Sequence, residues 1–396
     1  MVDLVKSLET CCGCGACAAV CPHGAITMRE DADGYVYPEV DSGRCVDCGA
    51  CLSACRFTTA EKRQPAAVYA AQWRRPELAG CASGGVFSAL ATQTLAAGGV
   101  VFGCRMQPED QWHPVLCKAE RPEDLNLLRG SKYVWSSTGT AYREVRDALR
   151  SGRSVLFSGL PCQVAGLKGF LRRDYEGLVT VDIICHGTPP PRLFAAYVAE
   201  LGRRRRGRMH DFRFRVKERG WGLYYYYYYW QGDKLKKRCR EYTRSVFYRL
   251  FLSSTLYRPS CYACPFAGRG RVADLTIGDC WGIGREHPEL DREKGGPMSF
   301  REGVSCVLVN SPAGRRLLEA AAGELETAEV TYESVARYNQ QLNHPSPRPA
   351  AREAYLAAFR HGGWRAVERT FLRRQWYPLM KEYVKKGLVS LKIVRR

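Results

Sequence analysis

Three features of the sequence predict a fold of the α+β / α/β class in three parts. Two dense cysteine runs lie within the first 60 residues, strand and helix patterns alternate through the middle of the chain, and a basic, helix-forming sequence closes it. The expected divisions are residues 1–60, a small module; residues 66–148 and 149–330, two halves of a mixed α/β core; and residues 331–396, a helical extension.

The cysteine runs are the strongest functional signal. Residues 11–21 and residues 45–55 both follow the spacing C-x-x-C-x-x-C-x-x-x-C, and Pro22 follows the first run. This is the spacing of bacterial ferredoxins, in which the fourth cysteine of each run ligates the other cluster. We therefore expect a ferredoxin-like module with two 4Fe-4S clusters. The expected ligands are Cys11, Cys14, Cys17 and Cys55 for one cluster, and Cys45, Cys48, Cys51 and Cys21 for the other.

A structural zinc site or a disulfide framework is the alternative for these cysteines. Zinc sites usually use two separated C-x-x-C pairs rather than four cysteines in one short run, so the spacing favours clusters. One departure from the pattern is that Arg56, not proline, follows Cys55, which removes no ligand. Cys12 lies between two expected ligands and is predicted to be a spare thiol.

The overall composition limits the class of protein. The chain has 396 residues, of which 45% are hydrophobic, and a formal net charge of +20. The first ten residues, with Asp3, Lys6 and Glu9, do not resemble a signal peptide, and no stretch reaches the ~18 apolar residues of a membrane span. Thiolate clusters need a reducing compartment, so we expect a cytoplasmic protein. The charge suits an acidic electron carrier, a ferredoxin or flavodoxin, although a solvated basic surface explains it equally well.

The core begins with a turn of small residues before a helix. Ser83, Gly84 and Gly85 precede an apolar helical stretch at residues 86–97, with Ser83 as the expected N-cap, and a strand is expected at residues 99–104. The glycines would let the backbone approach a ligand, and a helix N-terminus attracts phosphate. Many helices begin in this way, so the turn alone is weak evidence.

The next segment predicts parallel strands joined by helical crossovers. Cys162 and Cys185 would follow the carboxyl ends of two adjacent strands, which is the edge where open α/β sheets bind ligands. Cys162 would also lie at a positive helix end, which lowers the pKa of a thiol. The expected strands are residues 154–157 and 178–184, and the expected helices are residues 163–171 and 193–201.

The remaining patterns predict an antiparallel meander and a helical end. Residues 211–216 and 224–231 are expected strands, and the tyrosines at 224–229 should bury alternate side chains. A further strand beginning near residue 273 would run into a glycine-rich turn. Helices are expected at residues 246–256 and 312–326 and in several segments after residue 350.

Four further cysteines could ligate a third metal site. Cys162 and Cys185 stand alone at strand ends, whereas Cys261 and Cys264 form a C-x-x-C pair. Spacing alone leaves a third 4Fe-4S cluster, a zinc site and free thiols as alternatives. The other seven cysteines have no ligand spacing and fit packing as small hydrophobic residues: Cys12, Cys81, Cys104, Cys117, Cys239, Cys280 and Cys306.

Six short motifs are distributed over residues 66–285. They are Ser83-Gly84-Gly85-Val86-Phe87, Gly130-Ser131-Lys132-Tyr133, Ser158-Gly159-Leu160-Pro161-Cys162-Gln163, Cys185-His186-Gly187, Cys261-x-x-Cys264 and Ile277-Gly278-Asp279. Together they resemble the coenzyme F420 hydrogenase/dehydrogenase beta-subunit family, and the ferredoxin fusion is also similar to known members.

This resemblance implies a flavin-binding core with FAD and one 4Fe-4S cluster. The cluster would be held by the cysteines that match Cys162, Cys185, Cys261 and Cys264. FAD would lie against the Ser83-Gly84-Gly85 turn and the Lys132 segment, where a lysine would stabilise anionic flavin or phosphate charge. Tyr133 and Gln163 belong to the same motifs and complete the expected cofactor contacts.

His186 and Asp279 are the candidate catalytic residues, for proton delivery or flavin contact, although His186 would alternatively only shape the turn beside Cys185. The expected function is an iron–sulfur flavoprotein oxidoreductase. Electrons would enter the ferredoxin module from an acidic carrier, pass to the core cluster and reach FAD, and an unidentified organic acceptor would take a hydride. The ferredoxin fusion and the long basic C-terminal extension resemble bacterial members without an assigned substrate, which argues against reduction of coenzyme F420.

Two other classes of function remain as alternatives. One is a non-catalytic electron-transfer protein that feeds a partner oxidoreductase. The other is an iron–sulfur protein that binds nucleic acid through its positive charge, but the sequence lacks the interleaved basic and aromatic motifs of a nucleic-acid module. Rossmann-type nicotinamide binding has no support, because no G-x-G-x-x-G opens a helix after a strand.

Overall fold

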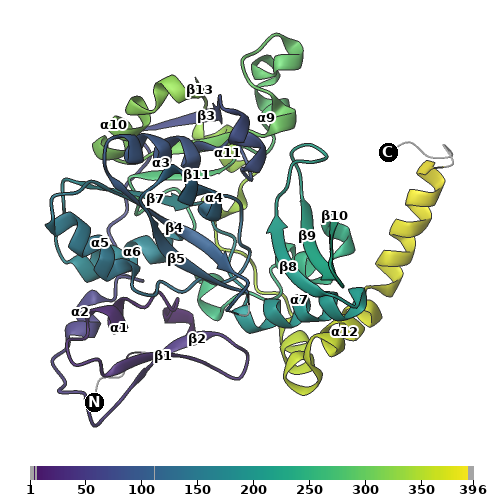
Figure 1. The fold of residues 1–396 in the computed structure, drawn as a ribbon, viewed down its shortest axis with the longest axis horizontal. Helices are drawn as coiled ribbons and strands as arrows, with labels where there is room; N and C mark the ends of the chain where they lie inside the picture. The colour runs from purple at the N-terminus through teal and green to yellow at the C-terminus, as the bar shows by residue number, and fades with distance from the viewer. Residues whose placement is uncertain (1–3, 5–6, 111, 391–396) are drawn as a thin grey trace.

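A mixed eight-stranded sheet forms the centre of the molecule (Figure 1). The structure is a computed structural model, and it describes residues 4, 7–110 and 112–390. The strands, in spatial order, are β13 (Leu325–Glu329), β3 (Ala67–Trp73), β12 (Ser305–Val309), β11 (Leu275–Asp279), β7 (Leu178–Ile183), β6 (Val155–Gly159), β4 (Val100–Gln107) and β5 (His113–Ala119).

The middle of this sheet is parallel. β4 pairs with β6, β6 with β7, and β7 with β11 in parallel, whereas β5, β12, β3 and β13 add antiparallel strands at the two sides. The predicted strand–helix–strand unit is confirmed, because β6, α6 (Pro161–Leu171), β7 and α7 (Pro191–Arg205) follow one another and β6 lies next to β7. The carboxyl ends of the parallel strands therefore share one edge.

Helices cover both faces of the sheet. α5 (Ala141–Arg150) and α6 pack on the face to which Val155 and Phe157 point. On the other face, Leu156 meets α3 (Val86–Ala96), α4 (Leu125–Leu128) and α10 (Pro312–Ala320). Because successive strand residues point to opposite faces, the apolar run at 155–157 supplies both cores.

The N-terminal module packs directly on α6. It contains α1 (Ala16–Val20), α2 (Ala50–Ala54) and the antiparallel pair of β1 (Ile26–Glu30) and β2 (Val36–Val40), and it lies below α5 and α6 in Figure 1. A Cβ added to Gly169 would lie 2.1 Å from the carbonyl oxygen of Ala54, and one added to Gly166 would lie 2.9 Å from Sγ of Cys14. The two glycines therefore allow the module to touch the helix backbone.

A second sheet and an aromatic core support the other side of the molecule. Tyr225, Tyr227 and Tyr229 are buried and the tyrosines between them are not, so the predicted alternation is confirmed. They pack with side chains from α7 and from the helices α8 and α12. The elements are β8 (Arg208–Phe214), β9 (Tyr224–Gln231), β10 (Lys234–Glu241), α8 (Val246–Leu252) and α12 (Arg352–Ser390), which is bent at Gly362 and Gly363.

Some boundaries differ from the sequence predictions. The helix expected at 312–326 ends at Ala320, and residues 325–329 form β13, because pairing with β3 outweighs local helix preference. The helix expected at 246–256 ends at Leu252, since Ser254 takes a left-handed φ of 58°. The short helices α9 (Ile283–Glu286) and α11 (Tyr332–Ala336) pack beside the end of the large sheet. None of the described helices is long and apolar enough to cross a membrane.

Candidate functional site

The eight expected cluster ligands of the N-terminal module form two groups. Burial raises the pKa of the Cys17 thiol, and the neighbouring thiols of Cys14, Cys11 and Cys55 raise it further. A separate small pocket is lined by the other four, Cys21, Cys45, Cys48 and Cys51. The fourth cysteine of each run thus lies beside the first three of the other run, because α1 and α2 pack against each other. This is the grouping expected from bacterial ferredoxin spacing.

A third group of cysteines lines a cavity in the core. Cys162 lies in the first turn of α6, Cys185 follows β7, and Cys261 and Cys264 come from the loop before β11. Cys12 of the N-terminal module lines the same cavity. In the described part of the chain, no three His, Cys, Asp or Glu side chains are placed to hold a single metal ion. The thiols line a cavity and do not converge on one point.

The wall of this cavity carries positive charge and unpaired polar atoms. Arg258 and Arg271 line it, and both are almost completely buried. Nε of Arg258 and Oγ of Ser260 are buried and, among the described residues, have no hydrogen-bond partner. The sulfur atoms of an iron–sulfur cluster accept hydrogen bonds, and its negative charge attracts guanidinium groups. Thiols, orphaned donors and arginines together fit a cluster.

The thiols of the cavity are hard to ionise without a metal. Burial raises the pKa of Cys264 to about 11, and the thiol of Cys261 adds to the effect. The expectation of a lowered pKa for Cys162 is wrong. A hydrogen bond with Cys12 lowers it, but desolvation and the thiols of Cys185 and Cys264 outweigh that bond. Metal binding releases such protons, so the site favours a positively charged metal over free thiolates.

A larger cavity of about 370 Å³ adjoins the thiol-lined one. It lies beyond the carboxyl ends of β6, β7 and β11, and Leu160 and His186 line both cavities. Gly84, expected at the flavin, does not line it. The expected site residues that do are Ser83, Gly85, Lys132, Tyr133, Gln163, His186 and Asp279.

The start of α3 differs in detail from the expectation. The N-cap is Gly85, with a φ of 76°, whereas Oγ of Ser83 donates to the carbonyl oxygen of Val304 (2.9 Å). Gly84 is wedged between strands, since an added Cβ would lie 2.2 Å from the carbonyl oxygen of Ala71. The first N–H groups of α3 have no partner within the helix, and the residues that carry them line the cavity beside Arg129. This end of the cavity suits an anion.

Lys132 is engaged with the backbone. Its Nζ donates to the carbonyl oxygens of Leu128 and Arg129 (both 2.9 Å) and of Gly130 (3.2 Å), which closes the end of α4. Desolvation lowers the pKa of Lys132 to about 8, and the nearby Cys104 opposes that shift. In this structure Lys132 therefore shapes the 130–133 segment while its side chain lines the cavity.

Asp279 is held by residues that the sequence did not indicate. Arg215 binds it through two hydrogen bonds (Nη1–Oδ2 2.5 Å, Nη2–Oδ1 2.7 Å), and Nε1 of Trp221 donates to it (2.9 Å). The guanidinium lies over Trp281, which stacks on Trp221 with ring centroids 4.7 Å apart. Desolvation lowers the pKa of His186, and the nearby Asp279 opposes the shift.

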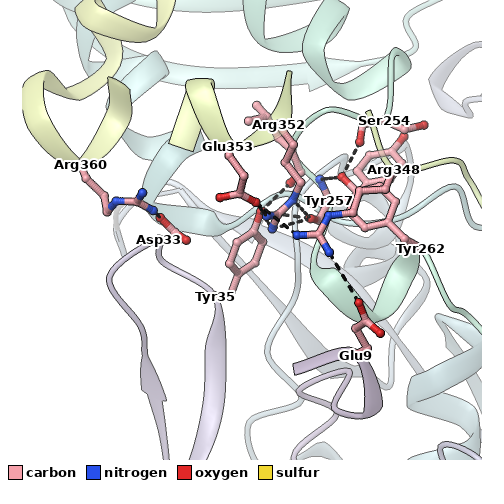
Figure 2. Close-up of polar contacts among 11 residues, drawn as sticks. Glu9, Asp33, Tyr35, Ser254, Tyr257, Tyr262, Arg348, Arg352, Glu353 and Arg360 are labelled. Atoms are coloured by element: carbon pink, nitrogen blue, oxygen red, sulfur yellow. Dashed lines mark hydrogen bonds and ion pairs between the residues drawn. The ribbon is translucent and has the colours of Figure 1, made fainter. Parts of the chain in front are cut away.

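The N-terminal module also contacts the C-terminal helix (Figure 2). Nη2 of Arg352 donates to Oη of Tyr35 (3.1 Å) and to the carbonyl oxygen of Tyr257 (3.2 Å). Tyr257 precedes the C-x-x-C pair, so the helix, the module and the cysteine loop meet at one place. Ion pairs at the rim join Arg348 to Glu9 and Arg360 to Asp33.

Three family matches cover most of the chain. Two of them are the amino-terminal and carboxy-terminal parts of one family, "Coenzyme F420 hydrogenase/dehydrogenase, beta subunit". Its amino-terminal part matches residues 68–142, and its carboxy-terminal part matches residues 152–333. Residues 10–59 match a "4Fe-4S dicluster domain".

Two curated proteins and one solved structure are similar to the chain. It is 27% identical over 190 residues to the F subunit of the F(420)H(2) dehydrogenase of Methanosarcina mazei, covering 45% of this chain and 53% of that protein. It is 26% identical over 187 residues to the coenzyme F420-dependent sulfite reductase of Methanocaldococcus jannaschii, covering 45% and 28%. A chain of the F420-reducing [NiFe] hydrogenase complex from Methanosarcina barkeri gives a TM-score of 0.46 and 17% identity, covering 71% of this chain and 89% of that one.

The chain thus spans about half of the first curated relative and a smaller share of the second. The two matched halves of one beta-subunit family lie in order along the sheet and its helices, and the dicluster match covers the N-terminal module. The chain therefore belongs to the coenzyme F420 hydrogenase/dehydrogenase beta-subunit family and carries a 4Fe-4S dicluster domain ahead of the family core.

Proposed function

We propose that this protein is an iron–sulfur flavoprotein oxidoreductase that takes electrons from an acidic carrier and delivers them to an organic acceptor. The observation that carries the proposal is the wall shared by two cavities. Four cysteines from three separate segments line one cavity, the expected flavin motifs line the other, and Leu160 and His186 belong to both. Oxidoreductase names among the curated relatives support the same class of activity.

Twelve cysteines would hold three clusters. Bound clusters and FAD would supply one-electron transfer and its conversion to the electron pairs that organic acceptors take. The protein would hold the metal sites by thiolates and exclude water from the core site with its buried arginines and aromatic rings. The proposed ligand sets are Cys11, Cys14, Cys17 and Cys55; Cys21, Cys45, Cys48 and Cys51; and Cys162, Cys185, Cys261 and Cys264.

The larger cavity has the chemistry that FAD needs. The N-terminus of α3 and Arg129 would bind the pyrophosphate, and apolar and aromatic side chains such as Phe251 would receive the rings. His186, desolvated at the wall of both cavities, would donate a hydrogen bond from a ring nitrogen or, once protonated, deliver a proton. Asp279, fixed by its ion pair with Arg215, would hold the side chains of Arg215 and Trp221 in place.

The surface beside the second ferredoxin site suits an acidic electron carrier. Arg44, Arg143 and Arg146 line an open depression that also includes Cys21 and His23. Positive charge next to a cluster steers an acidic partner and raises its association rate. We expect the rate at which reduced ferredoxin reduces the protein to fall steeply with ionic strength.

Iron, sulfide and flavin content of anaerobically purified protein tests the proposal. About twelve irons and one FAD per chain are expected. About eight irons without flavin would contradict it and leave electron transfer to a partner oxidoreductase as the function. Because both curated relatives are named for coenzyme F420, this coenzyme is the first acceptor to assay with the purified chain alone. Turnover of any organic acceptor by the single chain would exclude a purely electron-carrying role.

A further inference from the structure

Arg258 is a buried cation with no acidic partner among the described residues. Its side chain is 1% exposed. Nη2 donates to the carbonyl oxygen of Val36 (2.6 Å) and Nη1 to that of Cys11 (3.3 Å), while Nε has no partner. Arg271, similarly buried, is instead paired with Asp182 at 3.0 Å. A cation in a protein interior without an acidic partner is strongly destabilising, so a structure that keeps one points to a missing anion.

Arg258 lies between two of the three thiol groups. It lines the core cavity, and the N–H of Cys261 donates to its carbonyl oxygen (2.9 Å). Its other end reaches the backbone of Cys11. One arginine therefore contacts the backbone of proposed ligands of two different sites.

The surroundings of Arg258 screen its charge only weakly. The ring centroid of Tyr37 lies 4.5 Å from the guanidinium carbon, and those of Tyr35 and Trp135 lie 5.8 Å away. These rings exclude water, so electrostatic interactions are screened less than at the surface. Cys12 of the module also lines the core cavity together with Cys162, so it lies between the same two sites.

We propose that Arg258 is the shared counter-charge of the first ferredoxin cluster and the core cluster, and that it raises the reduction potentials of both. The inference rests on the proposed function, because it needs a cluster at the core cysteines. Each cluster gains one negative charge when it takes one electron from its neighbour, and a fixed cation stabilises the reduced form. The second ferredoxin cluster, whose proposed ligands line a separate pocket without Arg258, would be unaffected. Electrons that enter there are thus drawn toward the core.

The test is a redox titration of the full-length protein followed by electron paramagnetic resonance. In Arg258→Met, the midpoint potentials of the first ferredoxin cluster and the core cluster should become more negative, and that of the second ferredoxin cluster should stay at the wild-type value. Arg258→Lys, which keeps the charge, should shift both much less. The matched control is Arg269→Met in the same loop, where the exposed guanidinium pairs with Glu333, and it should shift none.

Equal shifts of all three clusters, or none in Arg258→Met, would overturn the proposal. If Arg258→Met does not retain its clusters, the Arg258→Lys variant decides the question. Retained clusters with potentials near the wild-type values would support a role of the charge. Lost clusters or strongly shifted potentials would refute it. The iron content of the wild type separates this inference from the proposed function. About eight irons would refute the core cluster itself, whereas about twelve irons with unmoved potentials would refute only the role of Arg258.

Discussion

Replacing Gly169 by alanine tests how closely the N-terminal module is packed on the core. The new Cβ would lie 2.1 Å from the carbonyl oxygen of Ala54, whereas ordinary contacts begin at 3.4 Å. The backbone of α2 would have to move by the difference, about 1.3 Å (3.4 − 2.1). Because α2 leads directly into Cys55, the displacement would reach a proposed cluster ligand.

The magnitude follows from two opposing effects. Glycine to alanine inside a helix is worth about 1 kcal/mol in favour of the helix. Overpacking against a backbone atom that cannot rotate away costs about 1–3 kcal/mol. We expect the overlap to outweigh the gain in helix propensity, with a net loss of up to about 2 kcal/mol and a Tm lower by a few degrees.

The assay compares thermal unfolding and the rate of iron loss to a chelator under anaerobic conditions. Gly284→Ala in α9 is the control, because its Cβ would lie 3.5 Å from the ring of Phe300, an ordinary contact. Gly169→Ala should melt earlier and lose iron faster than this control. If the two variants behave alike, the close approach of α2 to α6 is not present in the protein and the reasoning fails.

Three further predictions concern other parts of the site. Cys162→Ser should reduce iron content from about twelve to about eight per chain, whereas Cys239→Ser should not change it, and equal contents would remove the core cluster. Asp279→Asn leaves its buried arginine partner unpaired, so the free energy of unfolding should fall by about 3–5 kcal/mol and flavin retention should weaken. In the control Asp211→Asn, whose partner Arg213 is exposed, the loss should be about 0–1 kcal/mol. Desolvation lowers the pKa of Lys217 to about 8 in the folded protein. Above that pH the Lys217 amine is protonated in the unfolded chain but not in the folded one, so the folded state gains stability as pH rises. Relative to Lys217→Met, the wild type should gain about 2 kcal/mol between pH 7 and pH 10, and parallel stability curves would contradict a desolvated amine.

The sequence predicted those parts of the site that local spacing determines. The two cysteine runs indicated how the eight module thiols group, and the strand–helix–strand pattern indicated that Cys162 and Cys185 share one sheet edge. Both results depend on short stretches whose geometry follows from turns and strand direction. The strand β3 was missed because its sequence, AVYAAQW, is buried on both faces and shows no alternation.

What the sequence could not predict depends on contacts between distant segments. Arg215 meets Asp279 only because the loop between β8 and β9 folds over the end of β11, and no motif surrounds it. Arg258 looks in the sequence like an ordinary arginine before a proline, and only the absence of an acidic partner in the described structure distinguishes it. Cys12 was expected to be a spare thiol, and nothing in the sequence showed that it lines the core cavity beside Cys162.

The position of Cys12 bears on which electron-transfer step involves diffusion. Its side chain contacts Cys14 on one side and Cys162 on the other, so a single residue separates the module from the core site. That contact requires a glycine at position 166 of α6, because a Cβ there would collide with Cys14. The buried Arg352 also holds the module in place through its hydrogen bond to Tyr35. Under the proposed function, module and core would exchange electrons across this junction. Encounter with the proposed electron carrier would then be left to the part of the module where Cys48 is exposed and arginines line the depression at Cys21.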